Sequence, residues 1–132
     1  MRAFIALDIP PVLREDVAAL ARQLKTSVRG RFVPRENYHV TLAFLGDATE
    51  RELADTMGVL DEAASRFDPV DLAPDGLGKF GRAHDATLWL GFMQDPTLMN
   101  LAAFVRAGLD DAGVGFDAKP FLTHLTIARR AA

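Results

Sequence analysis

The chain has 132 residues, which suits one domain with a hydrophobic core, and it contains no cysteine, which excludes disulfides, thiolate catalysis and cysteine-ligated metal centres. Hydrophobic residues make up 49% and charged residues 25% of it, and the net charge of −3 argues against a broadly basic nucleic-acid-binding surface. The N-terminal apolar run meets proline too early for a signal peptide, and no run approaches the roughly 20 apolar residues that span a bilayer. We therefore expect a cytoplasmic protein without membrane contact.

The first part of the chain predicts a strand, a helix, a loop and a second strand. Residues 2–9 are a short apolar run that two prolines end, which is typical of a strand. Residues 11–25 carry apolar side chains at helical spacing with charges opposite them. An arginine-rich loop, residues 26–36, leads into a strand over residues 37–46. Alternation predicts that this strand faces the core with Val40, Leu42 and Phe44.

Residues 48–67 predict the second helix, which begins with a capping box formed by Thr49 and Glu52. Apolar residues at helical spacing define the stripe that we expect this helix to bury. The members of the stripe are Leu53, Met57, Leu60, Ala64 and Phe67.

The rest of the chain predicts strands on both sides of a third helix. Residues 68–85 indicate a strand with turns, and residues 86–93 a clear strand. The helix spans residues 95–113, with Asp95 as its cap and Gly113 as its terminator, and the last strand lies within residues 113–130. This order indicates an α+β or mixed α/β fold without an interdomain linker.

Two strands repeat one pattern, histidine, an apolar residue, then threonine. His39 and Thr41 belong to the first copy, and His124 and Thr126 to the second. Residues two apart on a strand point to the same face, so each histidine lies beside its threonine. If the two strands are neighbours, two imidazoles and two hydroxyls converge. One imidazole can then donate a proton while the other accepts one, and the hydroxyls can bind phosphate oxygens.

Simpler interpretations compete with a site. A lone histidine on a strand is more often structural, and threonine is a common strand residue. Two of the three histidines occupy the repeated pattern, however, which favours a site. A metal centre is the weaker alternative, because neither motif carries a carboxylate beside its histidine. We expect His84 to be a solvated loop residue and Trp89 a core or half-buried aromatic residue.

Two groups of arginines border the motifs. Arg29, Arg31 and Arg35 precede the first motif, where they can guide a polyanion or can simply be solvated. Arg129 and Arg130 follow the second motif and can neutralise phosphate charge. Strict alternation puts Arg130, not Arg129, on the face of His124, unless the strand bends there.

The paired motifs HVTL and HLTI, with their flanks MRAFIALDIP, ENYHVTLAFLG, LWLGF and HLTIAR, resemble the two-histidine phosphoesterase superfamily, and specifically LigT-like RNA 2′,3′-cyclic phosphodiesterases. The resemblance spans nearly the whole chain. It implies two pseudo-symmetric lobes within one domain, residues 1–132, each an antiparallel sheet with helices packed outside, and a cleft between them.

The same resemblance implies a reaction. RNA 2′,3′-cyclic phosphate ends, or nucleoside 2′,3′-cyclic phosphates, would be hydrolysed to 2′-phosphomonoesters without metal or cofactor. His39 would be the proton donor and His124 the proton acceptor, with Thr41 and Thr126 on the phosphate. The arginine that the family often has five residues after its second histidine corresponds to Arg129, so we favour Arg129 and keep Arg130 beside it.

Two departures from the family leave alternatives open. Thr123 stands where relatives often have proline, and the chain ends soon after Arg130, so the C-terminal part of the family fold is expected to be missing. An incomplete sheet edge would allow pairing with another copy. The alternatives are a nucleotide- or RNA-end-binding module with little turnover, a phosphodiesterase for a small cyclic nucleotide, and an interaction domain in which both motifs are only strands.

Overall fold

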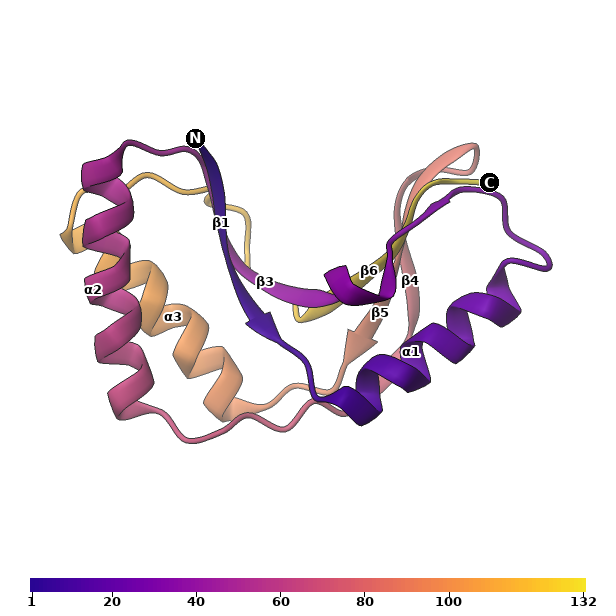
Figure 1. The fold of residues 1–132 in the computed structure, drawn as a ribbon, viewed down its shortest axis with the longest axis horizontal. Coiled ribbons are helices and arrows are strands. Elements are labelled where there is room, and N and C mark those ends of the chain that lie inside the picture. Colours follow the sequence, from indigo (N-terminus) through magenta and orange to yellow (C-terminus); the bar gives the residue numbers. More distant parts are fainter. The chain divides into compact units, whose positions relative to one another are not determined.

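The computed structural model describes residues 1–132 and has an α+β fold (Figure 1). Its helices are α1 (Pro11–Leu24), α2 (Glu50–Arg66) and α3 (Pro96–Asp111). Its strands are β1 (Arg2–Asp8), β2 (Arg31–Phe32), β3 (His39–Asp47), β4 (Pro74–Arg82), β5 (Asp85–Phe92) and β6 (His124–Ala131). The predicted order of elements is confirmed, with two additions in the arginine-rich loop: β2 and a short 3₁₀ turn, η1 (Arg35–Asn37).

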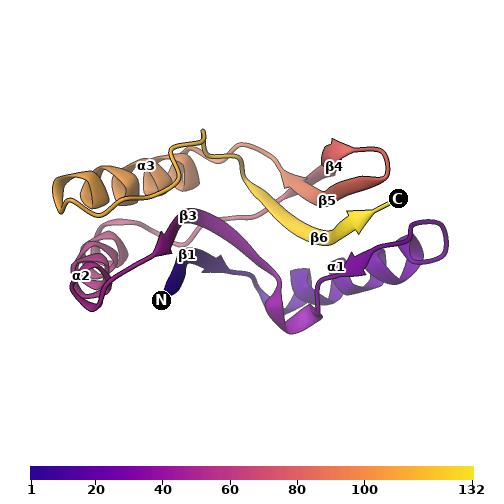
Figure 2. The ribbon, with the colours of Figure 1, turned by 90° about the horizontal axis from the view of Figure 1, so that it is seen from above.

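The strands follow the order β1-β3-β6-β5-β4, and β2 pairs with β6 off this path. β6 pairs antiparallel with β2, β3 and β5, and β4 pairs antiparallel with β5. Figure 2 shows β5 beside β6, the last strand. The strand that carries the second motif is therefore central, and the strand that carries the first motif is its neighbour.

The chain divides into two compact units. Unit 1 comprises residues 1–6, 41–71 and 94–122, and unit 2 comprises residues 7–40, 72–93 and 123–132. Most of β3 belongs to unit 1 and all of β6 to unit 2, so each unit holds the greater part of one motif strand. The cleft expected between two lobes stays a prediction.

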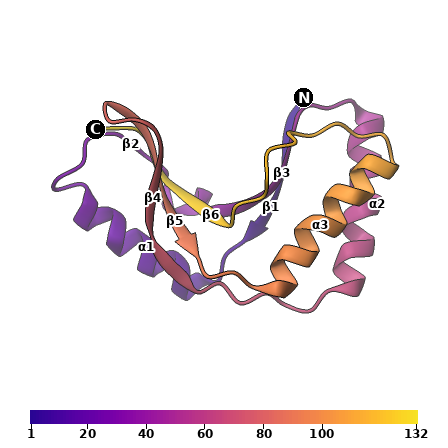
Figure 3. The same cartoon turned by 180° about the vertical axis from the view of Figure 1, so that it is seen from behind.

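In unit 1, α2 and α3 lie side by side (Figure 3). The N-terminus of α2 carries the predicted capping box, because Thr49 accepts a hydrogen bond from the Glu52 backbone N–H and the Glu52 carboxylate accepts one from the Thr49 backbone N–H. The cap and terminator of α3 are also confirmed: Asp95 accepts a hydrogen bond from the Thr97 backbone N–H, and Gly113 has a φ of 73°. The buried face of α3 consists of Leu98, Ala102, Val105 and Leu109.

Unit 2 buries one face of α1 together with residues of the central strands. The buried residues of α1 are Leu13, Val17, Ala18 and Ala21. The strands contribute Val40, Leu90, Leu125 and Ile127, of which Val40, Leu125 and Ile127 have no exposed surface. These buried side chains fix the backbone of β6 and of the first residues of β3. The side chains on the opposite face of the two strands therefore project from a fixed backbone.

Three predicted core residues are exposed instead. Phe44 is 51% exposed, because Leu42 and Ala43 are buried one after the other and the alternation of β3 shifts by one residue. Its ring lies 6.1 Å from the equally exposed ring of Phe4. On α2, Met57 and Ala64 face outward, and the residues one position earlier, Thr56 and Ala63, are buried. Thr56 is accommodated because its hydroxyl donates to the Glu52 carbonyl at 2.7 Å.

None of the three helices combines the length and the apolar composition that crossing a bilayer requires.

Candidate active site

The two histidine motifs lie on neighbouring strands of the sheet. Val40 of β3 is opposite Leu125 of β6 in an antiparallel pair. One step further along this pair places His39 opposite Thr126, on the face away from Val40 and Leu125. His124 shares that face as the second residue before Thr126, so His39 and His124 are diagonal neighbours, about 7–8 Å apart.

Burial separates the two faces of this strand pair. Val40 and Leu125 have no exposed surface, whereas His39, His124 and Thr126 are half-buried. Thr41 is also half-buried and follows His39 on the same face of β3. The sequence prediction that each histidine shares a face with its threonine is therefore confirmed by geometry, and the core side of the strands holds the backbone from which these side chains project.

The main chain orients His39. Its Nδ1 lies 2.7 Å from the carbonyl oxygen of Asn37, the last residue of η1. A carbonyl oxygen can only accept, so Nδ1 carries the hydrogen of this bond. The preceding residue, Tyr38, is 3% exposed and anchors this turn in the core. Burial raises the pKa of the Tyr38 phenol, and the charges of Arg22, Arg35 and Arg14 oppose that effect.

Two aromatic residues from the β4–β5 hairpin pack against His124. The Phe80 ring meets the imidazole edge to face, with centroids 5.6 Å apart, and the Trp89 ring does so at 5.9 Å. Phe80 and Trp89 are themselves 5.1 Å apart. Two aromatic rings therefore border His124. Trp89 is half-buried, and Phe80 is 45% exposed.

A glycine makes room for the Trp89 ring. Gly78 is the cross-strand partner of Trp89, and a Cβ atom at Gly78 would lie 2.3 Å from Cζ2 of the indole. The indole therefore occupies the space that a side chain at position 78 would need. Its Nε1 is buried without a hydrogen-bond partner, so this ring is held by packing and shape alone.

β6 does not alternate strictly beyond Thr126. Trp89 pairs with Thr126 but its neighbour Leu88 pairs with Ala128, so β6 has one more residue than β5 at this point. Ile127 and Ala128 are consequently both buried. The alternation that put Arg130 on the face of His124 does not hold, and the shift by one residue favours Arg129. Both arginines are exposed, and Arg130 has a φ of 51°.

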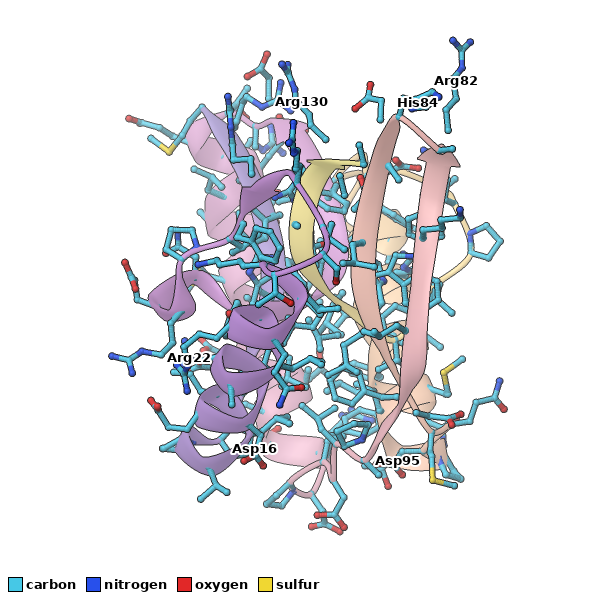
Figure 4. The ribbon with its side chains drawn as sticks, turned by 90° about the vertical axis from the view of Figure 1, so that its right-hand side faces the viewer. Asp16, Arg22, Arg82, His84, Asp95 and Arg130 are labelled. Atoms are coloured by element: carbon cyan, nitrogen blue, oxygen red, sulfur yellow. The ribbon has the colours of Figure 1, made fainter.

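The remaining sequence candidates lie elsewhere in unit 2. His84 is an exposed residue at the turn between β4 and β5, as expected, and Figure 4 shows it with Arg82 at the tip of that hairpin. Arg35 forms an ion pair with Glu15 at 2.9 Å, whereas Arg29 and Arg31 take part in none of the four ion pairs. No group of three or more histidine, aspartate or glutamate side chains has the arrangement of a metal site.

Two features of the site were missed by the sequence analysis. The Asn37 carbonyl is a main-chain group, and no residue type signals it. Phe80 was not considered because it lies in a segment rich in glycine and proline. The sequence does contain a pattern that indicates this contact. Gly78 and Phe80 are two residues apart on one strand, so they share a face on which a large side chain of the next strand can lie over the glycine and beside the phenylalanine.

Comparison with known proteins places this geometry in a family. Residues 7–89 match the model of a family described as LigT like phosphoesterase. An RNA 2′,3′-cyclic phosphodiesterase of Archaeoglobus fulgidus is 33% identical over 98% of this chain and 72% of its own length. One of Geobacillus stearothermophilus is 32% identical over 96% of this chain, which spans only 41% of that protein. A crystal structure of Escherichia coli LigT complexed with 3′-AMP superposes with a TM-score of 0.80 at 29% identity, over 99% of this chain and 74% of that one.

Proposed function

Because the chain belongs to the LigT-like phosphoesterase family, we propose that it hydrolyses 2′,3′-cyclic phosphates at RNA 3′ ends to 2′-phosphomonoesters. The observation that carries this proposal is the diagonal placement of His39 and His124 on one face of paired strands. The names of the two curated relatives support the substrate class. The chain spans 41% of one relative and 72% of the other, so we propose the activity for residues 1–132 and do not transfer the properties of the longer proteins.

The proposed reaction uses the two imidazoles as an acid and a base. His124 takes a proton from water, and the water oxygen attacks phosphorus. The bond between phosphorus and O3′ breaks, and protonated His39 donates its Nε2 hydrogen to O3′. The hydrogen bond from Nδ1 to the Asn37 carbonyl supports this role, because it fixes the imidazole through Nδ1, and we assign the proton donation to Nε2. Each turnover leaves His39 neutral and His124 protonated, so both exchange protons with solvent before the next cycle.

The other polar residues of the motifs stabilise the phosphate. The Thr41 and Thr126 hydroxyls donate hydrogen bonds to its non-bridging oxygens, and Arg129 offsets the negative charge that develops in the transition state. The shifted alternation of β6 supports Arg129 over Arg130 in this role. No step requires a metal ion, since the acid, the base and the charge stabilisation all come from side chains.

The test is hydrolysis of a nucleoside 2′,3′-cyclic phosphate by His39→Ala and His124→Ala, with His84→Ala as the matched control. A lost general acid or base lowers kcat by about 100- to 10,000-fold, whereas His84→Ala leaves the rate unchanged. The wild type gives a bell-shaped dependence of rate on pH, retains its activity in chelator, and yields the 2′-phosphate. Wild-type turnover in either motif variant refutes the proposal.

A binding module remains the alternative outcome of the same experiment. Tight binding of a 2′-phosphorylated nucleotide without any product after long incubation would identify the chain as an RNA-end-binding module. Turnover of small cyclic nucleotides with no turnover of RNA ends would identify the other alternative.

A further inference from the structure

Four arginines gather where β2 pairs with the end of β6. Arg31 is directly opposite Arg129 in the antiparallel register. Arg29 lies two residues before Arg31 in the chain, and Arg130 follows Arg129. All four are exposed. Like charges directly opposite each other on paired strands repel, so this arrangement lowers stability unless an anion lies between them.

Within residues 1–132 the protein supplies no ion-pair partner for these four arginines. Its four ion pairs involve the N-terminus with Asp47, Arg14 with Asp8, Arg35 with Glu15, and Arg66 with Glu62. Although the net charge of the chain is −3, these four exposed arginines form a concentrated positive region at one end of β6. Figure 4 shows Arg130 at that end.

The backbone holds these arginines close together. Arg29 and Ala132 exchange two backbone hydrogen bonds of 3.1 and 2.8 Å, and the Val33 N–H donates to the Ile127 carbonyl at 2.8 Å. Between them, a Cβ atom at Gly30 would lie 3.0 Å from the Arg129 carbonyl oxygen. Glycine at position 30 thus allows β2 to approach β6, and the Arg31–Arg129 pair is a fixed feature of the sheet.

We propose that Arg31, together with Arg29, binds a backbone phosphate of an RNA strand on the 5′ side of the cyclic phosphate. This inference rests on the proposed function. Arg129 is three residues beyond Thr126 on β6, and because one of these residues is the extra residue of the strand, the advance along the sheet is about 7 Å. A strand whose 3′ end lies at His39 and His124 can continue towards this region. Guanidinium groups suit phosphate, since their planar N–H donors contact two oxygens at once. The preferred substrate is therefore an oligonucleotide with an internal phosphodiester.

The experiment compares two substrates, a nucleoside 2′,3′-cyclic phosphate and a dinucleotide with the same cyclic end. We expect the wild type to prefer the dinucleotide in kcat/KM. Arg31→Gln lowers kcat/KM for the dinucleotide about tenfold more than for the mononucleotide, because one charge-assisted contact is lost. It also reduces the salt dependence for the dinucleotide by about 0.7 in a double-logarithmic plot, and Arg31→Lys restores part of both.

Arg22→Gln is the matched control. Arg22 is exposed on α1, forms no ion pair, and lies apart from Arg130 in Figure 4. Arg22→Gln removes the same charge from the same unit. Because the Arg22 charge also acts on Tyr38, a change common to both substrates reports net charge or the Tyr38 turn and not a phosphate contact. We expect it to change kcat/KM equally for both substrates.

The outcomes separate this inference from the proposed function. Equal losses for both substrates in Arg31→Gln, or no preference for the dinucleotide in the wild type, overturn the phosphate-binding role while mononucleotide hydrolysis still stands. If the wild type hydrolyses neither substrate, the proposed function fails. The same variants are then compared for binding of a dinucleotide and a mononucleotide that each end in a 2′-phosphate. Selective weakening of dinucleotide binding by Arg31→Gln supports the role, and unselective weakening refutes it.

Discussion

Substituting Gly78 with alanine tests whether the Trp89 ring positions His124. The new Cβ atom would lie 2.3, 2.4 and 2.7 Å from three carbons of the indole. Carbon atoms pack at about 3.5–4.0 Å, so the ring has to move by more than about 1 Å. Overpacking of this kind costs about 1–3 kcal/mol of unfolding free energy. Because the Trp89 ring contacts the His124 imidazole, displacement of a catalytic group by about 1 Å then lowers kcat by up to about 100-fold.

Two measurements check this reasoning, the unfolding free energy from denaturant titration and kcat on a nucleoside 2′,3′-cyclic phosphate. Gly58→Ala is the matched control, because Gly58 lies on α2 with nothing within 4 Å of its added Cβ. Alanine there leaves stability unchanged or raises it by up to about 1 kcal/mol.

A double-mutant cycle isolates the contact itself. Trp89→Phe removes the overlapping atoms together with the unpartnered Nε1 group, so Gly78→Ala costs much less in that background. The reasoning is refuted if Gly78→Ala unfolds at the wild-type denaturant concentration. If stability falls but kcat per folded molecule does not, the link from Trp89 to His124 is wrong.

Two further predictions concern stability. Thr49→Ala removes the capping box of α2 and lowers the unfolding free energy by about 1 kcal/mol in denaturant titration; a change below the error of that measurement would contradict the assignment. Tyr38 has a raised pKa through burial, so above about pH 10 the unfolded state loses its phenolic proton more readily than the folded state and stability falls with rising pH. Unfolding titrations between pH 8 and pH 11, values chosen about the ordinary tyrosine pKa, should show this decline in the wild type and a smaller one in Tyr38→Phe.

Local signals in the sequence predicted most elements. The capping box at Thr49, the Asp95 cap and Gly113 each act through hydrogen bonds or backbone angles within a few residues, so a sequence reveals them. The repeat of histidine and threonine was also visible, because its spacing determines which side chains share a strand face.

Features that depend on a partner strand could not be predicted in this way. β2 is two residues long and exists through its pairing with β6. The extra residue in β6 is defined only by comparison with β5, and it removes the alternation argument for Arg130 over Arg129. Phe44 was assigned to the core by alternation, which fails where two consecutive residues of β3 are buried. On α2, the burial of Thr56 depends on a hydrogen bond that hydrophobic spacing does not describe.

The contact between His39 and the Asn37 carbonyl has a consequence for mutational tolerance. Every amino acid carries a backbone carbonyl, so replacing the Asn37 side chain leaves the acceptor in place. Proline is the exception, because it lacks the N–H that donates to the Pro34 carbonyl at 2.9 Å and closes η1. Position 37 is otherwise open to diversification in a library of variants. The number of residues between Pro34 and His39 is not, because a deletion or insertion in η1 would move the carbonyl away from the imidazole. At this point the protein is robust to substitution and sensitive to length.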